Sequence, residues 1–166
     1  MHPVELVPSL TARRGKPEDA PFIAALARQV FSVYGSYDRY LLEWFGSPQV
    51  VTLVAEADGV PAGLAMLATL ADSDSAGSRA ELLAIAVEPS LQLRGIGGFL
   101  LSQAIAVAPR LAAEPPVREI RLSVAEGNAR AARLFARHGF RRLAGSGLYP
   151  AGQRARLMAL ALPAGT

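Results

Sequence analysis

Apolar residues along this chain fall into strand-like runs and into helical spacing. Val50–Ala57 and Ala62–Leu70 are apolar runs joined by Asp58-Gly59, a pair typical of tight turns, and together they predict a β-hairpin. Ala80–Val87 is almost continuously apolar, which predicts a strand near the centre of a sheet. Further strands are expected at Leu10–Arg13, Arg118–Val124, Phe140–Ala144 and Arg154–Ala161.

Four segments have the spacing and the end signals of helices. Pro17 and the acidic pair after it suit the first turn of a helix whose apolar side chains continue to Val30. Asn128 can cap the start of a later helix, and Gly139 can end it. The other two helices are predicted at Tyr37–Phe45 and Gly97–Ala108.

Strands and helices follow one another without strict alternation. This order predicts an α/β or α+β fold in three layers with a mixed sheet. The length of 166 residues fits one domain. We expect that domain to span residues 1–166, with a core of about 9–162.

The residue inventory excludes several kinds of chemistry. The chain contains no cysteine, so it has no disulfide, no thiolate metal site and no cysteine nucleophile. Its two histidines, His2 and His138, are far apart in sequence, so we expect no metal site. The N-terminus lacks the features of a signal peptide, and no uncharged stretch reaches the ~18 residues of a membrane span. We therefore expect a soluble, cytoplasmic protein without a membrane partner.

Positive charge gathers in the C-terminal part of the chain. Nine arginines lie between Arg118 and Arg156, against the two acidic residues Glu119 and Glu126. Such a segment suits a polyanion, either nucleic acid or a phosphorylated cofactor. A solvated basic surface has the same pattern, so charge alone leaves these alternatives open.

A glycine-rich turn separates the predicted central strand from the helix after it. Three glycines between positions 95 and 98 lie beside Arg94. Backbone amides at a helix start bind anions, so the turn predicts a pyrophosphate site. The alternative is a tight turn whose glycines only allow the helix to pack on the strand. A P-loop and a dinucleotide fingerprint fit poorly, because Phe99 and Leu100 stand where those motifs need other residues.

Two motifs resemble those of the GCN5-related N-acetyltransferases, the GNAT family. The segment AELLAIAVEPSLQLRGIGG is similar to the family's acetyl-CoA motif, with Gln92, Gly95 and Gly97 at its diagnostic positions. The second motif, NARAARLFARHGF, follows in the family's order and runs from Asn128 to Phe140. The resemblance covers nearly the whole chain. It implies a mixed, mostly antiparallel sheet of six to seven strands flanked by about four helices.

The resemblance also implies which residues bind acetyl-CoA (coenzyme A). The edge of Ile85–Val87 would pair with the pantetheine arm between two strands that splay apart, and an amide of Ala86 or Val87 would polarise the thioester carbonyl. Asn128 and Phe135 would lie against the arm. The amides that would hold the pyrophosphate belong to Leu93, Arg94, Gly95, Ile96, Gly97 and Gly98.

Acyl transfer to an amine requires that the amine lose a proton, because a lysine-type amine has a pKa of about 10.4. Glu81 is the candidate base, since a glutamate base occurs there in the histone-acetylating branch of the family; a solvated glutamate at a strand start is the alternative. In a regular strand Glu81 would share a face with Leu83, Ile85 and Val87, and apolar neighbours would raise its pKa.

The chain departs from the family pattern at two positions. Phe135 stands where the usual tyrosine acid would be, so either another group protonates the sulfur or it leaves as a thiolate. Tyr149 is the candidate replacement acid, and Ser123 is a second. Ser123 also stands where the ribosomal-protein N-terminal acetyltransferases carry a glutamate, which argues against that branch.

Together these features predict a GNAT-type acyltransferase that uses acetyl-CoA to acetylate a primary amine directly, on a small molecule or on a peptide or protein N-terminus. Aromatic residues between Tyr34 and Trp44 would wall the acceptor pocket, although core aromatics have the same pattern. The alternative is a non-catalytic or weakly active acyl-CoA-binding regulatory module. Nucleic-acid binding by the C-terminal arginines is a third class that we do not expect. The oligomeric state stays open, with a homodimer as one option.

Overall fold

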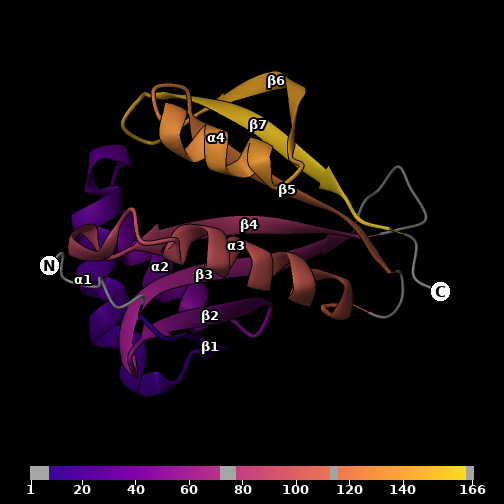
Figure 1. Cartoon of the computed structure of the whole chain (residues 1–166). Coiled ribbons are helices and arrows are strands. Elements are labelled where there is room, and N and C mark those ends of the chain that lie inside the picture. The colour runs from indigo at the N-terminus through magenta and orange to yellow at the C-terminus, as the bar shows by residue number, and fades with distance from the viewer. Residues whose placement is uncertain (1–7, 72–77, 113–115, 164–166) are drawn as a thin grey trace, which may run out of the picture.

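The computed structural model describes residues 8–71, 78–112 and 116–163, which form one seven-stranded sheet with helices on both faces (Figure 1). The strand order is β1-β2-β3-β4-β5-β7-β6, and every neighbouring pair except β4 and β5 is antiparallel. This confirms the expected mostly antiparallel sheet and the central place of β4. The strands are β1 (Leu10–Arg14), β2 (Val50–Ala57), β3 (Val60–Ala71), β4 (Ser78–Val87), β5 (Val117–Ala125), β6 (Arg141–Leu148) and β7 (Arg154–Ala161).

In the described ranges, four α-helices cover the two faces of the sheet. The helices α1 (Ala20–Phe31) and α2 (Tyr37–Phe45) pack on one face, and α3 (Ile96–Val107) and α4 (Ala129–Arg137) pack on the other (Figure 1). Their ends lie close to the predicted ones. Within the described ranges, no helix has the length and apolar character needed to cross a membrane.

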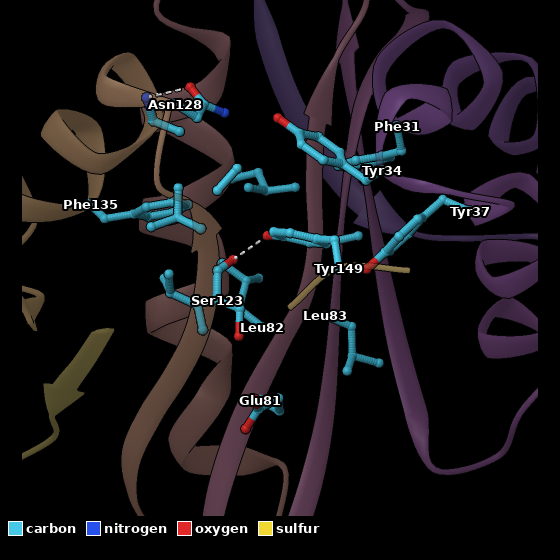
Figure 2. Close-up of a pocket in the computed structure, with 16 residues that line it drawn as sticks. Phe31, Tyr34, Tyr37, Glu81, Leu82, Leu83, Ser123, Asn128, Phe135 and Tyr149 are labelled. Atoms are coloured by element: carbon cyan, nitrogen blue, oxygen red, sulfur yellow. Dashed lines mark hydrogen bonds between the residues drawn. The ribbon is translucent and has the colours of Figure 1, made fainter. Parts of the chain in front are cut away.

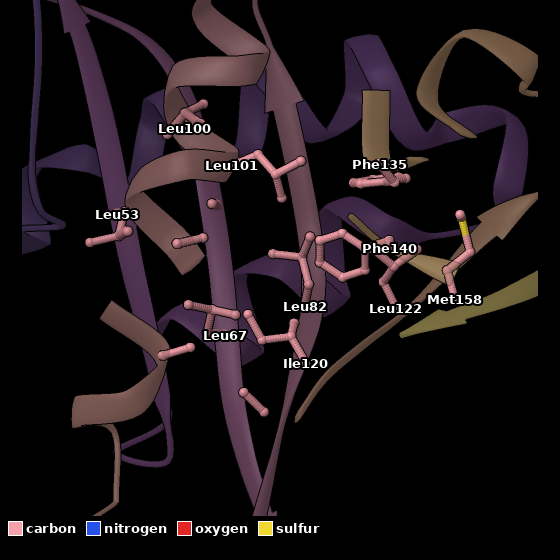
Figure 3. Close-up of a cluster of buried hydrophobic side chains, with 14 of the residues drawn as sticks. Leu53, Leu67, Leu82, Leu100, Leu101, Ile120, Leu122, Phe135, Phe140 and Met158 are labelled. Carbon is pink, nitrogen blue, oxygen red and sulfur yellow. The ribbon is translucent and has the colours of Figure 1, made fainter. Parts of the chain in front are cut away.

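Side chains alternate along the strands into two buried clusters, one on each face. On β3, Leu64 and Met66 belong to the cluster beneath α1 and α2, whereas Ala65 and Leu67 belong to the cluster beneath α3 and α4. The second cluster is shown in Figure 3 and extends from β2 across to β7. The glycine turn and the second motif are therefore held by the same core.

A β-bulge interrupts β4. Opposite β3, Ala84 pairs with Met66 and Leu82 pairs with Leu67, so Leu83 is an extra residue in β4. An extra residue of this kind reverses the alternation of side chains in the rest of the strand. The two halves of β4 consequently place odd-numbered residues on opposite faces of the sheet.

The bulge overturns the expectation that Glu81 shares a face with Ile85 and Val87. Both apolar side chains pack against the cluster beneath α3 and α4. Leu82 also belongs to that cluster, so its neighbour Glu81 points to the opposite face, on the side of α1 and α2. Of the three expected neighbours, Leu83 alone lies on that side.

Strand β6 extends four residues beyond the predicted end at Ala144 and reaches Leu148. It is an edge strand, most of its side chains are exposed, and its register with β7 shifts between Arg142 and Ser146. An exposed and irregular edge strand has no alternation of apolar and polar side chains. The strand predicted from the sequence pattern therefore ended too early.

An ion pair ties β1 to the start of α1. Asp19 is 6% exposed, and its carboxylate accepts two hydrogen bonds from the Arg13 guanidinium, at 2.8 and 2.9 Å. It also accepts a hydrogen bond from the Lys16 amide at 2.7 Å. Hydrogen bonding to Arg13 holds the pKa of Asp19 below its usual range.

We expect Asp19→Asn to lower the free energy of unfolding by about 2 kcal/mol at neutral pH, because the charge-assisted pair with Arg13 is lost. Since the folded-state pKa is depressed, this contribution is complete above the unfolded-state pKa of about 3.9 and disappears as the pH falls through the folded-state value. Denaturant unfolding at neutral pH and at about pH 2.5 measures the effect. The difference between the wild type and the variant should shrink in acid, and an equal difference at both values would contradict the role of the charge.

Candidate active site

The two central strands separate toward the C-terminal end of β4. Their parallel pairing begins at Ser78–Val117 and ends at Leu82–Leu122. Beyond that point the strands diverge, and a pocket of about 210 Å³ lies between them (Figure 2). The pocket is bounded on one side by β4 and on the other by β5 and the start of α4.

Successive residues of β4 point their backbone N–H and C=O groups to opposite sides, one residue toward β3 and the next toward the gap. The Glu88 amide donates to the Ala62 carbonyl of β3 at 2.8 Å, so the peptide group of Ala86 also faces β3. The amides of Ile85 and Val87 therefore face the gap. Of the two candidate amides for polarising a carbonyl, the geometry favours Val87 over Ala86.

The turn after β4 presents a row of backbone amides to open space. Gly95 is the N-cap of α3 with φ at 81°, and Leu93 has φ at 70° with its side chain 86% exposed. A Cβ on Gly95 would meet no atom within 4 Å. Between Leu93 and Gly98, no amide donates a backbone hydrogen bond to any described residue. A left-handed leucine beside amides without partners fits a backbone arranged for an anion.

Gly97 and Gly98 face α4 rather than open space. A Cβ on Gly97 would lie 3.4 Å from Leu134, and a Cβ on Gly98 would lie 3.7 Å from His138. The two glycines inside α3 thus allow close approach of α3 and α4 beside the turn. From the sequence, the glycines indicate that some group comes close to the backbone at this turn. They do not indicate that α4 is such a group.

Gln92 and Arg130 bridge the two sides of the gap. The side-chain amide of Gln92 donates to the Val87 carbonyl at 3.3 Å, and Arg130 donates to the side-chain oxygen of Gln92 at 3.4 Å. Val87 is the last residue of β4, and Arg130 lies in the first turn of α4. The bridge therefore spans the end of the gap next to the glycine turn.

Asn128 and Phe135 contribute to the pocket wall from the α4 side. Asn128 caps α4 as expected, because its side-chain oxygen accepts a hydrogen bond from the Ala131 amide at 3.2 Å. Its side-chain nitrogen remains as a donor turned toward the pocket (Figure 2). Phe135 is buried and meets Phe140 edge-on with ring centroids 5.8 Å apart. A phenyl ring at this place offers no proton to a reaction in the pocket.

Glu81 lines the pocket within a group of four charged side chains. Its carboxylate lies 3.8 Å from Arg79, and across the strands it pairs in register with Arg121, which forms an ion pair with Glu119. Burial raises the pKa of Glu81 above its usual value, and the positive charges of Arg79 and Arg121 oppose that shift. A partly buried carboxylate with a raised pKa is better suited to accept a proton near neutral pH than a fully solvated one.

Tyr149 reaches the pocket from the turn between β6 and β7. Its hydroxyl donates to the Ser123 carbonyl at 3.2 Å (Figure 2). Its ring packs against Tyr34 and Tyr37, with ring centroids 4.8 and 6.1 Å away. Burial raises the pKa of Tyr149 to about 12. The phenol is therefore protonated throughout the neutral range.

The β6–β7 turn is fastened to the segment that follows α1. The Ala151 amide donates to the Tyr34 carbonyl at 3.3 Å, and the Gln153 side chain donates to the Val33 carbonyl at 2.6 Å. These bonds join residues more than a hundred positions apart in sequence. They hold the Tyr149 ring beside Tyr34 at the pocket.

The sequence model of the GNAT acetyltransferase family matches residues 21–140 of the chain. The chain belongs to the GNAT acetyltransferase family. Solved structures agree on the fold. NAA60 of Arabidopsis thaliana in complex with acetyl-CoA has a TM-score of 0.74 and 20% identity, covering 93% of this chain and 99% of that one. Ard1 from Thermoplasma volcanium has a TM-score of 0.77 and 18% identity over the same shares of the two chains.

A third structure, the PaiA N-acetyltransferase from Thermoplasma acidophilum in complex with coenzyme A, has a TM-score of 0.71 and 20% identity, covering 93% of this chain and 99% of that one. At these identities the similarity establishes a shared fold. Comparison with curated protein sequences finds no match. The described residues of this GNAT acetyltransferase contain no group of three or more His, Asp or Glu side chains that could hold a metal ion.

Sequence reasoning missed several residues that line the pocket of this GNAT protein. Phe31 lies in the wall at the end of α1, and Leu83 lies there because of the bulge. Neither has a sequence signal of its own, since each is one apolar residue among many. Arg79 lies beside Glu81 without lining the pocket. It could have been found, because residues two apart in a strand share a face and Arg79 precedes Glu81 by two.

Proposed function

We propose that this protein is an N-acetyltransferase that uses acetyl-CoA and transfers the acetyl group directly to a primary amine of a small molecule or of a peptide or protein N-terminus. The observation that carries the proposal is the gap between β4 and β5, with free amides at its mouth and a partly buried carboxylate, Glu81, in its wall. The use of acetyl-CoA is supported by NAA60 and PaiA, which share the fold and bind acetyl-CoA and coenzyme A.

The turn after β4 fits the diphosphate of the cofactor. Open space before Gly95 leaves room for a phosphate, and the amides from Leu93 to Gly98 lack backbone partners within the described ranges. Arg94 is exposed beside them and would add a positive charge. Ile85 and Val87 would offer backbone groups to the pantetheine arm, and Asn128 would donate from the opposite side. When bound, the cofactor supplies an activated acetyl thioester whose thiol has a pKa of about 8.5.

Glu81 would accept the proton that the amine must lose. An amine attacks only in its neutral form, and its pKa of about 8 to 10.4 keeps most of it protonated near neutral pH. Burial raises the pKa of Glu81, which brings the carboxylate closer to the range in which proton acceptance is efficient. Arg79 and Arg121 limit the rise and keep the carboxylate ionised over more of that range.

Tyr149 would donate a hydrogen bond to the sulfur rather than a proton. A phenol whose pKa is raised to about 12 is a weaker acid than a thiol with a pKa of about 8.5, so full proton transfer is uphill. Because the hydroxyl stays protonated, it can stabilise negative charge that develops on the sulfur. Its hydrogen bond to the Ser123 carbonyl would be exchanged for this contact.

Tyr149→Phe is expected to lower kcat about tenfold, the effect of one hydrogen bond to a charged atom. Tyr34→Phe is the matched control, because it removes a hydroxyl from the ring that packs against Tyr149 and should change kcat less than about twofold. Steady-state release of free thiol measures both variants. A loss of more than about 100-fold in the Tyr149 variant would show proton donation instead, and an unchanged kcat would remove Tyr149 from the reaction.

A non-catalytic or weakly active acyl-CoA-binding module is the second candidate function. Phe135 favours it, because its ring carries no acidic proton, and the Tyr149 hydroxyl is bound to a backbone carbonyl. A panel of amines and peptide N-termini with acetyl-CoA, read as free thiol, separates the two. Turnover with any amine supports the enzyme. Tight cofactor binding without turnover supports the module, and absence of cofactor binding contradicts both.

The remaining sequence-based expectations complete the proposal. Residues 1–166 would form a single acetyltransferase domain, since one sheet includes strands from Leu10 to Ala161. The C-terminal arginines would face the phosphates of the cofactor rather than nucleic acid. A cytoplasmic location and a homodimer stay predictions.

A further inference from the structure

Four aromatic rings form the wall of the pocket on the side of α1 and α2. Phe31, Tyr34, Tyr37 and Tyr149 all line it (Figure 2). The rings are contiguous, with centroids 5.8 Å apart for Phe31 and Tyr37, 6.1 Å for Tyr37 and Tyr149, and 4.8 Å for Tyr149 and Tyr34. Such a wall packs against flat apolar groups and attracts a cation to the faces of its rings.

The charge of the pocket is restricted to one carboxylate. Among the described residues that line it, Glu81 is the single acidic side chain, and none is lysine or arginine. Arg79 and Arg121, whose positive charges act on Glu81, lie next to Glu81 and Glu119, so that two positive charges meet two negative ones. The charges of these four side chains balance. A ligand that carries a carboxylate would therefore find no surplus positive charge among them.

We propose that the acceptor is a small aromatic primary amine whose amine-bearing carbon carries no carboxylate. Its ring would pack against Tyr34, Tyr37 and Tyr149, and its amino group would point toward Glu81. The inference rests on the proposed function and narrows its substrate. Free α-amino acids are disfavoured, because their carboxylate would lose water in an apolar pocket without gaining a cationic partner.

The test compares 2-phenylethylamine with phenylalanine, which differ by one carboxylate and have amines of similar basicity. Calorimetry on the protein saturated with coenzyme A measures binding without turnover. We expect 2-phenylethylamine to bind at least about 100-fold more tightly than phenylalanine. Phenylalaninamide should bind nearly as well as 2-phenylethylamine, since it has the size of the amino acid without its charge, and ethanolamine should bind weakly because it has no ring.

A variant provides the reverse test. Ser123 lines the pocket and is exposed, so a longer side chain there fits without repacking the core. Ser123→Lys should reduce the preference for 2-phenylethylamine over phenylalanine about tenfold. Ser123→Met, of similar length and without charge, should leave that preference unchanged. If both variants melt like the wild type and give the same ratio, the charge of the pocket does not determine the acceptor.

The outcomes separate this inference from the proposed function. Equal binding of phenylalanine and 2-phenylethylamine, or acetylation of amino acids in preference to aromatic amines, overturns the inference and leaves the acetyltransferase assignment in place. Failure of every amine and peptide in the wider panel, with coenzyme A bound, contradicts the proposed function itself.

Discussion

Gly97→Glu is expected to weaken coenzyme A binding by about 1,000-fold, because like charges in direct contact cost several kcal/mol. The glutamate would begin at a Cβ 3.4 Å from Leu134 and 3.9 Å from Val87, between α3, α4 and the end of β4. From there its carboxylate would extend toward the amides that would hold the diphosphate, because helical side chains lean toward the N-terminus of their helix. It would both occupy those donors and repel the phosphates. Calorimetric titration with coenzyme A measures the loss.

Gly97→Ala is the matched control for that variant. Its methyl group makes the same close contact with Leu134, so the two variants share any packing cost, and thermal unfolding reports that cost directly. The alanine variant should keep coenzyme A affinity within about tenfold of the wild type. A glutamate variant that melts like the alanine variant and still binds coenzyme A as the wild type does would contradict the assignment of the turn.

Glu81→Gln is expected to lower kcat by about 10²- to 10⁴-fold, the usual range for loss of a general base. It should also remove the acidic limb of the pH–rate profile. Since burial raises the pKa of Glu81, the wild-type rate should rise with pH through a midpoint above the usual glutamate value of about 4.3. Coenzyme A affinity should not change, because Glu81 lies in the wall of the pocket and not at the glycine turn.

Glu119→Gln is the control for Glu81→Gln. Glu119 lies on the same face of the sheet, in the strand next to Glu81, and does not line the pocket. Its negative charge raises the pKa of Glu81, so its removal should retain the acidic limb and move it to lower pH. If Glu81→Gln keeps the wild-type profile, another group is the base.

The sequence predicted the strands and helices of this protein well where burial sets the pattern. The run Ala80–Val87 has apolar side chains on both faces, so its central place in the sheet followed directly. Asp58 and Gly59 adopt φ of 51° and 82°, as the expected tight turn requires. Asn128 caps α4 for the reason that its side-chain chemistry suggests. The predicted length of the edge strand β6 was too short, because its exposed residues do not alternate between apolar and polar.

The geometry of the site could be predicted only in part. The family motifs pointed to Glu81, Asn128 and the glycine turn, and the structure brings Glu81 and Asn128 to one pocket with the turn beside it. The bulge at Leu83 was not predictable, because it arises from the pairing of β4 with β3 and not from local sequence. It placed Glu81 on the face opposite to Ile85 and Val87, with which the sequence pattern had grouped it.

Long-range contacts account for the rest of what the sequence did not show. Tyr149 was singled out as a candidate, but its neighbours are set by hydrogen bonds from Ala151 and Gln153 to the segment after α1. Those bonds bring Tyr34 and Tyr149 together from opposite ends of the chain. The aromatic wall, on which the proposed choice of acceptor depends, is thus a product of the folded structure.

Chemical-shift mapping of backbone amides during a titration with coenzyme A tests the central claim most directly. The account predicts that the largest amide shifts occur between Leu93 and Gly98, together with Val87 and the side-chain amide of Asn128. Titration with inorganic pyrophosphate should move the first group alone. If those amides keep their shifts at saturating coenzyme A, the cofactor binds elsewhere and the account is wrong.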